Sequence, residues 1–243
     1  MHQLFSFDFL NTISKQLHEA LDGLVVTKLN ADTLRELREC QTANAAKQGV
    51  YLLYSDDQPV YLGKADDVAG RLEEHMTKLH GRQHIDADKI GYKAILLEKS
   101  MSTAANEDVL IALFTDRHTG MWNGKGFGPK DPGQERDTTR PSYFDSHYPI
   151  RLDIDIPDIG DDETLNSLCQ KMKAHLPWVF RFKLNGRKND PINLRGVDRR
   201  PEPLLQAVVD RLGAGWRGAV LSFGMVLYES RKEYRFGRVV DPR

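Results

Sequence analysis

The first 47 residues carry apolar side chains at the spacing of amphipathic helices. This spacing runs through DFLNTISKQLHEAL (8–21) and NADTLRELRECQTANAA (30–46). Asn30 or Asp32 can cap the second helix, because short polar side chains accept hydrogen bonds from the first free backbone amides. The pattern predicts an N-terminal helical arm over residues 1–47.

The pattern changes to short strands at residue 49. GVYLLY (49–54) and PVYLGK (59–64) are rich in β-branched and aromatic residues, and the polar SDDQ between them is typical of a turn. The two segments therefore predict a β-hairpin. A third strand is predicted over KIGYKAILLE (89–98).

Two helices are expected beside these strands. Asp66 or Asp67 can cap the first, and Ser102 can cap the second, which runs through Phe114. Residues 48–128 are thus predicted to form a core domain, with a small antiparallel sheet flanked by helices. The apolar positions of the first helix recur at helical spacing: Val68, Leu72, Met76 and Leu79.

The chain beyond residue 128 is predicted to elaborate this core. Residues 120–149 are rich in Gly, Pro and aromatic residues, which favours a long ordered wrapping loop. The C-terminal part, 129–243, is expected to be an α/β region for specificity and dimerisation. Its predicted elements are a helix running into a strand (165–184), a helix (201–213) and a last strand pair around GAVLSFGMVLYES and YRFGRVV. The predicted class is α+β.

Composition sets outer limits on the class of protein. A chain of 243 residues with 40% hydrophobic content can bury a real core. The longest apolar run, 218–228, is too short to span a bilayer, and the N-terminus lacks the features of a signal peptide. A cytoplasmic protein without a membrane partner is expected. Cys40 and Cys169 are expected to be ordinary reduced thiols, because no CxxC partner accompanies either.

Charge is distributed unevenly, although the net charge is only -1. The segment 151–163 holds six acidic residues against one basic, and the segment 181–200 holds seven basic against two acidic. The basic segment is a candidate for phosphate contacts. A solvated loop is the common alternative for such a run.

Glu107 is the strongest single candidate for chemistry. It shares a helical stripe with Leu110, Ile111 and Phe114, which places a carboxylate on an apolar face. Burying an unpaired charge costs several kcal/mol, so the carboxylate would require a cation, a metal or a proton. The alternative is a glutamate in the first helical turn that points to solvent.

Two further pairs are candidates because of their spacing. Arg71 and His75 are four residues apart and share a face of their predicted helix. Tyr51 and Tyr61 lie in the middle of their strands and face away from the neighbouring aliphatic residues. The two tyrosines are expected to share a face only if they pair directly, through an odd-length turn or a bulge. Each of these residues, taken alone, is more often packing or surface.

The joint pattern resembles the GIY-YIG nuclease superfamily. The resemblance rests on G-V-Y, Y-L-G, an Arg ten residues after the second Tyr, a His four residues later, a helical Glu, and W-N at 122–123. It covers residues 49–128. Val50 and Leu62 are conservative replacements of the two isoleucines in the motif that gives the family its name. The segment WNGKGFGPKDPGQERD with SYFDSHYP is further similar to restriction endonucleases of the Eco-twenty-nine-k-I type, with Phe144-Asp145 in place of Trp-Asp.

The resemblance implies magnesium-dependent hydrolysis of both strands of double-stranded DNA at a GC-rich palindromic site. Glu107 would hold one Mg²⁺ per active site, for which Mn²⁺ can substitute, and Arg71 would contact the phosphate. Tyr51 is the expected general base, although a phenol with a pKa of about 10 is mostly protonated at neutral pH. Arg71 or the metal could lower the pKa of Tyr51, or His75 could accept its proton, and the sequence does not decide between these routes. Tyr61 would orient the water or form a hydrogen bond with the phosphate, and Asn123 would hold the site together.

Specificity and assembly are expected to come from outside these residues. A palindromic target implies a homodimer, and a cognate DNA methyltransferase would be the genetic partner. The competing functions are a repair incision nuclease of the UvrC type and a DNA-binding regulator without catalysis. The predicted DNA-binding residues are Lys64, Arg136, Arg187, Lys188, Arg195, Arg199 and Arg200.

Overall fold

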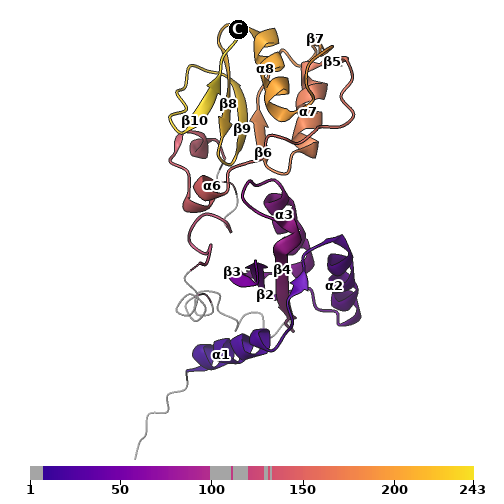
Figure 1. Cartoon of the computed structure of the whole chain (residues 1–243), viewed down its shortest axis with the longest axis vertical. Helices are drawn as coiled ribbons and strands as arrows, with labels where there is room; N and C mark the ends of the chain where they lie inside the picture. The colour runs from indigo at the N-terminus through magenta and orange to yellow at the C-terminus, as the bar shows by residue number, and fades with distance from the viewer. Residues whose placement is uncertain (1–7, 99–110, 112–119, 129–130, 132) are drawn as a thin grey trace, which may run out of the picture. The chain divides into compact units, whose positions relative to one another are not determined.

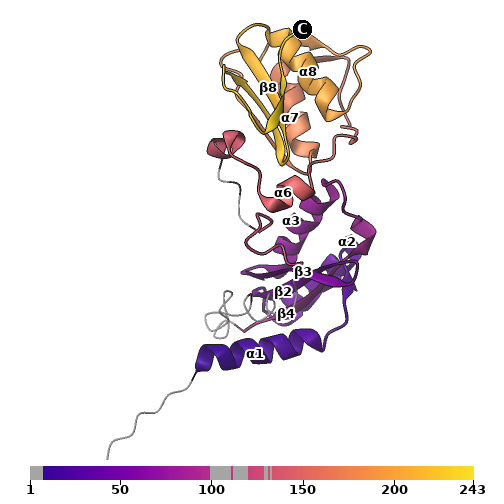
Figure 2. The same cartoon turned by 60° about the vertical axis from the view of Figure 1, so that its left-hand side comes forward.

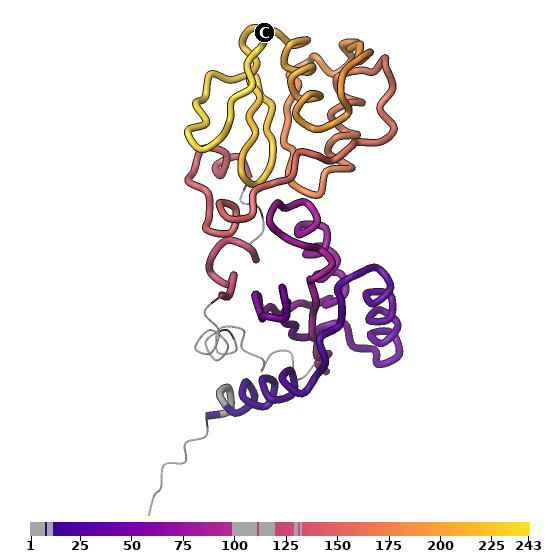
Figure 3. Tube along the Cα trace, viewed as in Figure 1, coloured from indigo at the N-terminus to yellow at the C-terminus, as the bar shows by residue number. Residues whose placement is uncertain are grey.

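A computed structural model of the protein describes residues 8–98, 111, 120–128, 131 and 133–243 (Figures 1 and 3). The chain divides into two compact units. The first comprises 1–79 and 86–128, and the second comprises 80–85 and 129–243. Each unit contains its own mixed set of helices and strands, which confirms the predicted α+β class.

The first unit is built on a four-stranded antiparallel sheet in the order β1-β4-β2-β3. The segment 1–47, predicted to be helical, also supplies the edge strand β1 of this sheet. The strands are β1 (Thr27–Lys28), β2 (Gly49–Ser55), β3 (Gln58–Ala65) and β4 (Ile90–Leu96). The helices are α1 (Phe9–Asp22), α2 (Ala31–Ala43), α3 (Val68–His80) and the short η1 (Ala87–Lys89).

Caps fix where two of these helices begin. Asn30 and Thr33 form a reciprocal capping box at the start of α2. At the start of α3, the Asp67 carboxylate accepts a hydrogen bond from the backbone amide of Gly70 at 3.0 Å. Of the alternative caps named from the sequence, the structure thus selects Asn30 and Asp67. The predicted helix from Ser102 to Phe114 lies outside the described residues apart from Ile111, which is helical.

The hairpin between β2 and β3 contains a bulge that decides which side chains share a face. Asp56 and Asp57 turn the chain with φ of 48° and 61°, and Tyr54 pairs with Pro59. One step further Leu53 pairs with Tyr61, so Val60 is an extra residue. Without it, β3 would shift by one position and every side chain beyond it would change face.

The two faces of this sheet are covered by different helices. Val50, Leu52 and Leu62 form one core cluster with Leu17 and Leu21 of α1. The alternate residues point to the opposite face, where α3 lies (Figure 1). That second face carries the predicted catalytic tyrosines.

The second unit packs helices α7 and α8 on one side of a four-stranded sheet (Figures 1 and 2). The strand order is β10-β8-β9-β6, with β6 and β9 parallel and the other pairs antiparallel. The predicted helix-to-strand segment is confirmed as α7 (Leu165–His175) followed by β6 (Val179–Phe182), and the predicted helix 201–213 as α8 (Pro201–Leu212). The expected last strand pair is a set of three: β8 (Trp216–Leu221), β9 (Gly224–Glu229) and β10 (Gly237–Val240).

Three features of the second unit were not predicted. The loop 120–149 contains the short helices η2 (Gln134–Thr138) and α6 (Tyr143–His147). The strands β5 (Asp162–Thr164) and β7 (Pro191–Asn193) form a separate two-stranded sheet, which joins the acidic and the basic segments. Such three-residue strands are too short to give a readable alternation of polar and apolar residues.

The structure bears on two sequence-based expectations, one about the cysteines and one about membrane-spanning helices. Cys40 is exposed and Cys169 is buried, and both are free thiols. Burial raises the pKa of the Cys169 thiol to about 12. Among the described residues, no helix is both long enough and apolar enough to span a bilayer.

Candidate active site

Tyr51 of β2 and His75 of α3 form the centre of the candidate site. The Tyr51 hydroxyl lies 2.8 Å from His75 Nε2, and the two side chains are 1% and 2% exposed. The hydroxyl donates this hydrogen bond when Nε2 carries no proton. The sheet and the helix therefore hold a phenol and an imidazole in direct contact, away from bulk water.

Tyr61 joins this pair on the same face of the sheet. Its ring centroid lies 6.2 Å from that of Tyr51 and 5.4 Å from that of His75. The tyrosines share the face as diagonal neighbours, because Tyr51 pairs with Gly63 and Tyr61 pairs with Leu53. The expectation of direct pairing was wrong, and the bulge at Val60 supplies the required parity.

Phe127 covers the imidazole. Its ring stacks on His75 with centroids 4.7 Å apart and an interplanar angle of 24°, and it meets the ring of Tyr61 edge-on at 4.9 Å. Lys78, one turn after His75 on α3, donates a hydrogen bond to the Phe127 carbonyl and lies 4.7 Å from the centre of its ring. Sequence reasoning missed Phe127 and Lys78 as site residues. Their only signals were a lone aromatic between glycines and a Lys at the spacing i+3 from His75.

Two glycines make room for the phenols. A Cβ atom at Gly63 would overlap with the hydroxyl of Tyr51, and a Cβ atom at Gly128 would overlap with that of Tyr61. Gly63 belongs to the Y-L-G segment, and Gly128 ends the G-F-G segment. Both glycines are thus explained by close approach of a tyrosine rather than by turn geometry.

The pKa of His75 falls from its ordinary value of 6.5 to about 3. Burial is the main cause, because it disfavours the charged imidazolium, and the positive charges of Arg71 and Lys78 act in the same direction. His75 is therefore a neutral imidazole at neutral pH. A neutral ring can accept the hydrogen bond that the Tyr51 hydroxyl offers.

Arg71 lies at the margin of this cluster and is held by two acceptors. One guanidinium nitrogen pairs with Glu74 at 2.6 Å, and another donates to the Gly128 carbonyl at 2.7 Å. Burial lowers the pKa of Arg71, but the hydrogen bond with Glu74 and the interaction with Tyr51 outweigh it, so the net shift is upward. Glu74 is exposed, and an exposed ion pair contributes only about 0 to 1 kcal/mol. A phosphate can therefore replace Glu74 on this guanidinium at little cost.

Asn123 supports the strand that carries Tyr61. Its side chain donates to the carbonyl of Leu62 at 2.8 Å and accepts from the amide of Leu62 at 3.0 Å. The backbone amide of Trp122 also donates to the carbonyl of Val60. These contacts continue the hydrogen bonding of the sheet beyond its outer strand β3. Asn123 therefore has a structural role, because it holds β3 in place.

Glu107, the predicted metal ligand, lies outside the described residues. Among those that are described, no group of three or more His, Cys, Asp or Glu side chains could hold a metal ion. The side chains at the centre of the site are phenols, an imidazole and a guanidinium, and a hard cation prefers carboxylate and water oxygens.

Several predicted DNA-binding arginines are occupied by aspartates. Arg187 pairs with Asp190, and both Arg195 and Arg199 pair with Asp161 of the acidic segment. The acidic and basic segments thus neutralise each other in part. Of the remaining candidates, Arg200 pairs with Asp198, Lys188 is exposed, and Lys64 lies at the end of β3.

Arg136 is part of a chain of alternating arginines and aspartates in the second unit. It pairs with Asp145, which is fully buried, and with Asp131 at 3.9 Å. It also lies over the ring of Phe223, with 4.0 Å between guanidinium and ring centre. The order along the chain of ion pairs is Arg82, Asp145, Arg136, Asp131, Arg181 and Asp137. We call this set the Arg–Asp network, and its contacts assign Arg136 a structural role.

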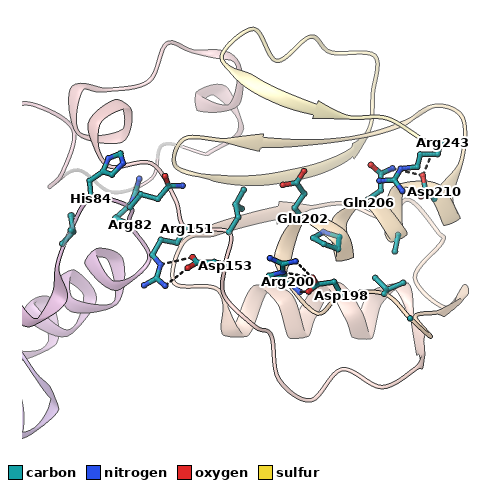
Figure 4. A pocket seen from close by; sticks show the side chains of 17 residues that line it. Arg82, His84, Arg151, Asp153, Asp198, Arg200, Glu202, Gln206, Asp210 and Arg243 are labelled. Carbon is teal, nitrogen blue, oxygen red and sulfur yellow. Dashed lines mark hydrogen bonds and ion pairs between the residues drawn. The ribbon is translucent and has the colours of Figure 1, made fainter.

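A cavity of about 940 Å³ lies in the second unit and contains none of the predicted catalytic residues (Figure 4). Its lining contains four arginines and four carboxylates, and two ion pairs form within it, Arg151 with Asp153 and Arg200 with Asp198 (Figure 4). Such self-neutralised walls present no net charge to a ligand. We therefore place the candidate active site at Tyr51 and His75 and not in this cavity.

A comparison of the chain with protein-family models and with curated protein sequences gives no match.

Proposed function

We propose that the chain is a magnesium-dependent DNA endonuclease of the GIY-YIG type that cleaves both strands of a GC-rich palindromic site, in the manner of a type II restriction endonuclease. The observation that carries the proposal is the contact between the Tyr51 hydroxyl and His75 Nε2, on the face that also holds Tyr61. Arg71 stands beside them with an exchangeable partner.

Tyr51 is the proposed proton acceptor for the attacking water. In the proposed step the phenol oxygen takes a proton from the attacking water while the hydroxyl proton of Tyr51 passes to Nε2 of the neutral His75 ring along their hydrogen bond. The positive charge of Arg71 favours negative charge on that oxygen. With a pKa of about 3, His75 orients the phenol and is a weak store for the proton before DNA binds.

Arg71 and Tyr61 act on the phosphate. The guanidinium of Arg71 exchanges Glu74 for non-bridging phosphate oxygens, to which it presents paired donors. The hydroxyl of Tyr61 orients the water or the phosphate. A Mg²⁺ ion held by Glu107 would supply Lewis acidity at the leaving oxygen.

The assembly follows from the symmetry of the substrate. One active site per chain and two strands to cut require two chains, so we propose a homodimer on DNA. A cognate DNA methyltransferase would protect the host sequence, and both proteins would act in the cytoplasm.

Incubation of purified protein with plasmid and Mg²⁺ tests the proposal. We expect discrete double-strand fragments, which EDTA abolishes and Mn²⁺ restores. Glu107→Ala should remove cleavage and keep DNA binding. Damage-dependent nicks would instead assign a repair incision nuclease, and a mobility shift without cutting would assign a DNA-binding regulator.

A further inference from the structure

The connection between β9 and β10 is a basic surface segment. Residues 230–236, SRKEYRF, hold three basic residues and one acidic residue. Arg231, Lys232, Arg235 and Phe236 are exposed, with Phe236 at 47%. We call residues 230–236 the β9–β10 connection (yellow in Figure 3).

The cations of this connection differ from the arginines of the basic segment 181–200. The side chains of Arg231, Lys232 and Arg235 form no ion pair or hydrogen bond with any residue in the described part of the chain. In the segment 181–200, each arginine is paired with an aspartate. Those aspartates cancel much of the field that a phosphate would encounter there. Arg231, Lys232 and Arg235 have no such aspartate partner in the described part of the chain, so their field is not cancelled in this way.

The backbone of the connection is fixed before any partner binds. Ser230 donates its amide to the Gly215 carbonyl at 3.0 Å, and Arg217 donates to the Lys232 carbonyl at 3.0 Å. At the other end, Gly237 donates to the carbonyl of Tyr234, whose side chain is 3% exposed. Cations on a fixed backbone lose less backbone conformational entropy on binding than cations on a free loop.

The course of the connection spreads its cations along the sheet. β9 ends at Glu229, which pairs with Trp216, and β10 begins at Gly237, which pairs with Leu221. The connection must therefore travel the length of β8. Tyr234 anchors it by packing on Ala219, Leu221, Phe223 and Val226, a different cluster from the one that α7 and α8 cover.

We propose that the β9–β10 connection is a docking surface for the phosphate backbone of duplex DNA, with Arg231, Lys232 and Arg235 as contacts that do not depend on base sequence. The inference rests on the proposed function, because it takes DNA as the partner. Three cations without an ion-pair partner, against the single carboxylate of Glu233, fit an anionic polymer on which phosphates recur at regular intervals. The arginines of 181–200 are then mainly structural.

Salt dependence of DNA binding tests the assignment. Binding of the full chain to a fluorescent 30-base-pair duplex is measured by anisotropy in Ca²⁺, between about 50 and 300 mM salt. The triple variant R231Q/K232Q/R235Q is compared with R187Q/R195Q/R200Q, which removes the same charge from paired arginines. Each released phosphate contact changes the slope of log K against log salt by about 0.9, so the first variant should flatten the slope by about 2.7. The matched control should change it by less than about 1.

Each possible result supports or overturns the assignment of the β9–β10 connection as a DNA-binding surface. Equal slopes for both variants, or a larger change for the matched control, would overturn the inference. Loss of binding to phosphatidylserine vesicles with unchanged DNA binding would assign the surface to a membrane instead. If the wild type cuts plasmid and the connection variant keeps the full slope, only this inference fails. If the wild type binds DNA with the expected slopes but does not cut, the proposed nuclease fails and the surface stands. Absence of DNA binding by the wild type would overturn both.

Discussion

Each unit contains one buried polar cluster, and the two clusters differ in the charge of their side chains. The cluster of Tyr51, Tyr61 and His75 consists of two phenols and an imidazole, and the pKa of His75 falls to about 3 mainly because burial disfavours its charged form. The Arg–Asp network consists of ion pairs, and each of its arginines meets at least one aspartate. Removal of one partner from a buried ion pair is costly for the fold, whereas a group kept in an unusual protonation state is a candidate for chemistry.

Substitutions in the two clusters should therefore affect different properties, catalytic activity in the first and folding stability in the second. In the first cluster, a substitution should change chemistry more than folding, because the groups are neutral and largely aromatic. In the Arg–Asp network, a substitution leaves a charge buried without its partner, so folding should suffer first. Four predictions test this separation, from the largest expected effect to the smallest.

Removal of the Tyr51 hydroxyl should have the largest effect on activity. Tyr51→Phe keeps the ring and removes the proposed base, so cleavage of plasmid should fall about 10²- to 10⁴-fold. The matched control is Tyr54→Phe, which deletes a hydroxyl from the same strand on the opposite face. Rates are measured under single-turnover conditions. Comparable rates for the two variants would remove Tyr51 from the mechanism.

Neutralisation of Asp145 should have the largest effect on stability. Asp145→Asn leaves Arg82 and Arg136 without their shared carboxylate, which should lower the free energy of unfolding by about 3 to 5 kcal/mol. Urea denaturation followed by circular dichroism measures the loss. Asp153→Asn, in an exposed pair with Arg151, is the control and should cost less than about 1 kcal/mol. A loss at Asp145 no larger than at Asp153 would show that the network is dispensable.

An added methyl group at Gly63 should affect both properties at once. In Gly63→Ala the new Cβ overlaps with the Tyr51 hydroxyl, so the phenol must shift away from His75. We expect a loss of about 1 to 3 kcal/mol in stability, together with reduced cleavage. Gly120→Ala is the control, because among the described residues no atom lies within 4 Å of its added Cβ. Full activity of Gly63→Ala would mean that the Tyr51–His75 contact is not required.

Acid should weaken the first cluster modestly. The unfolded chain protonates His75 near pH 6.5, and the folded chain does so only near pH 3, so stability is lost as the pH falls through this window. Between pH 7 and pH 5.5 the contribution is about 1 kcal/mol. The measurement is urea denaturation at several pH values. His75→Gln should flatten this dependence, and an unchanged dependence would assign it to other groups.

Patterning alone identified most elements of the fold. The hairpin 49–64, the helix after it and the helix-to-strand segment near 165–184 each have a clear period and a clear cap or turn. It did not identify β1, β5 or β7, because strands of two or three residues contain too few positions for a period. The resemblance of the joint pattern to a nuclease superfamily selected Tyr51, Tyr61, Arg71 and His75 as a set, although each taken alone is more often packing or surface. The structure brings Tyr51, Tyr61 and His75 together, with Arg71 at their margin.

Local sequence by itself determined the spacing of the candidate residues and the faces of the helices, because both depend on short-range geometry. Tertiary structure alone decided the rest. The bulge at Val60 sets which face Tyr61 occupies, since the register of a hairpin depends on the pairing of two strands. Pairing of Asp161 with Arg199 decides which cations remain uncompensated, because electrostatic fields depend on distances in space that the order of residues does not specify.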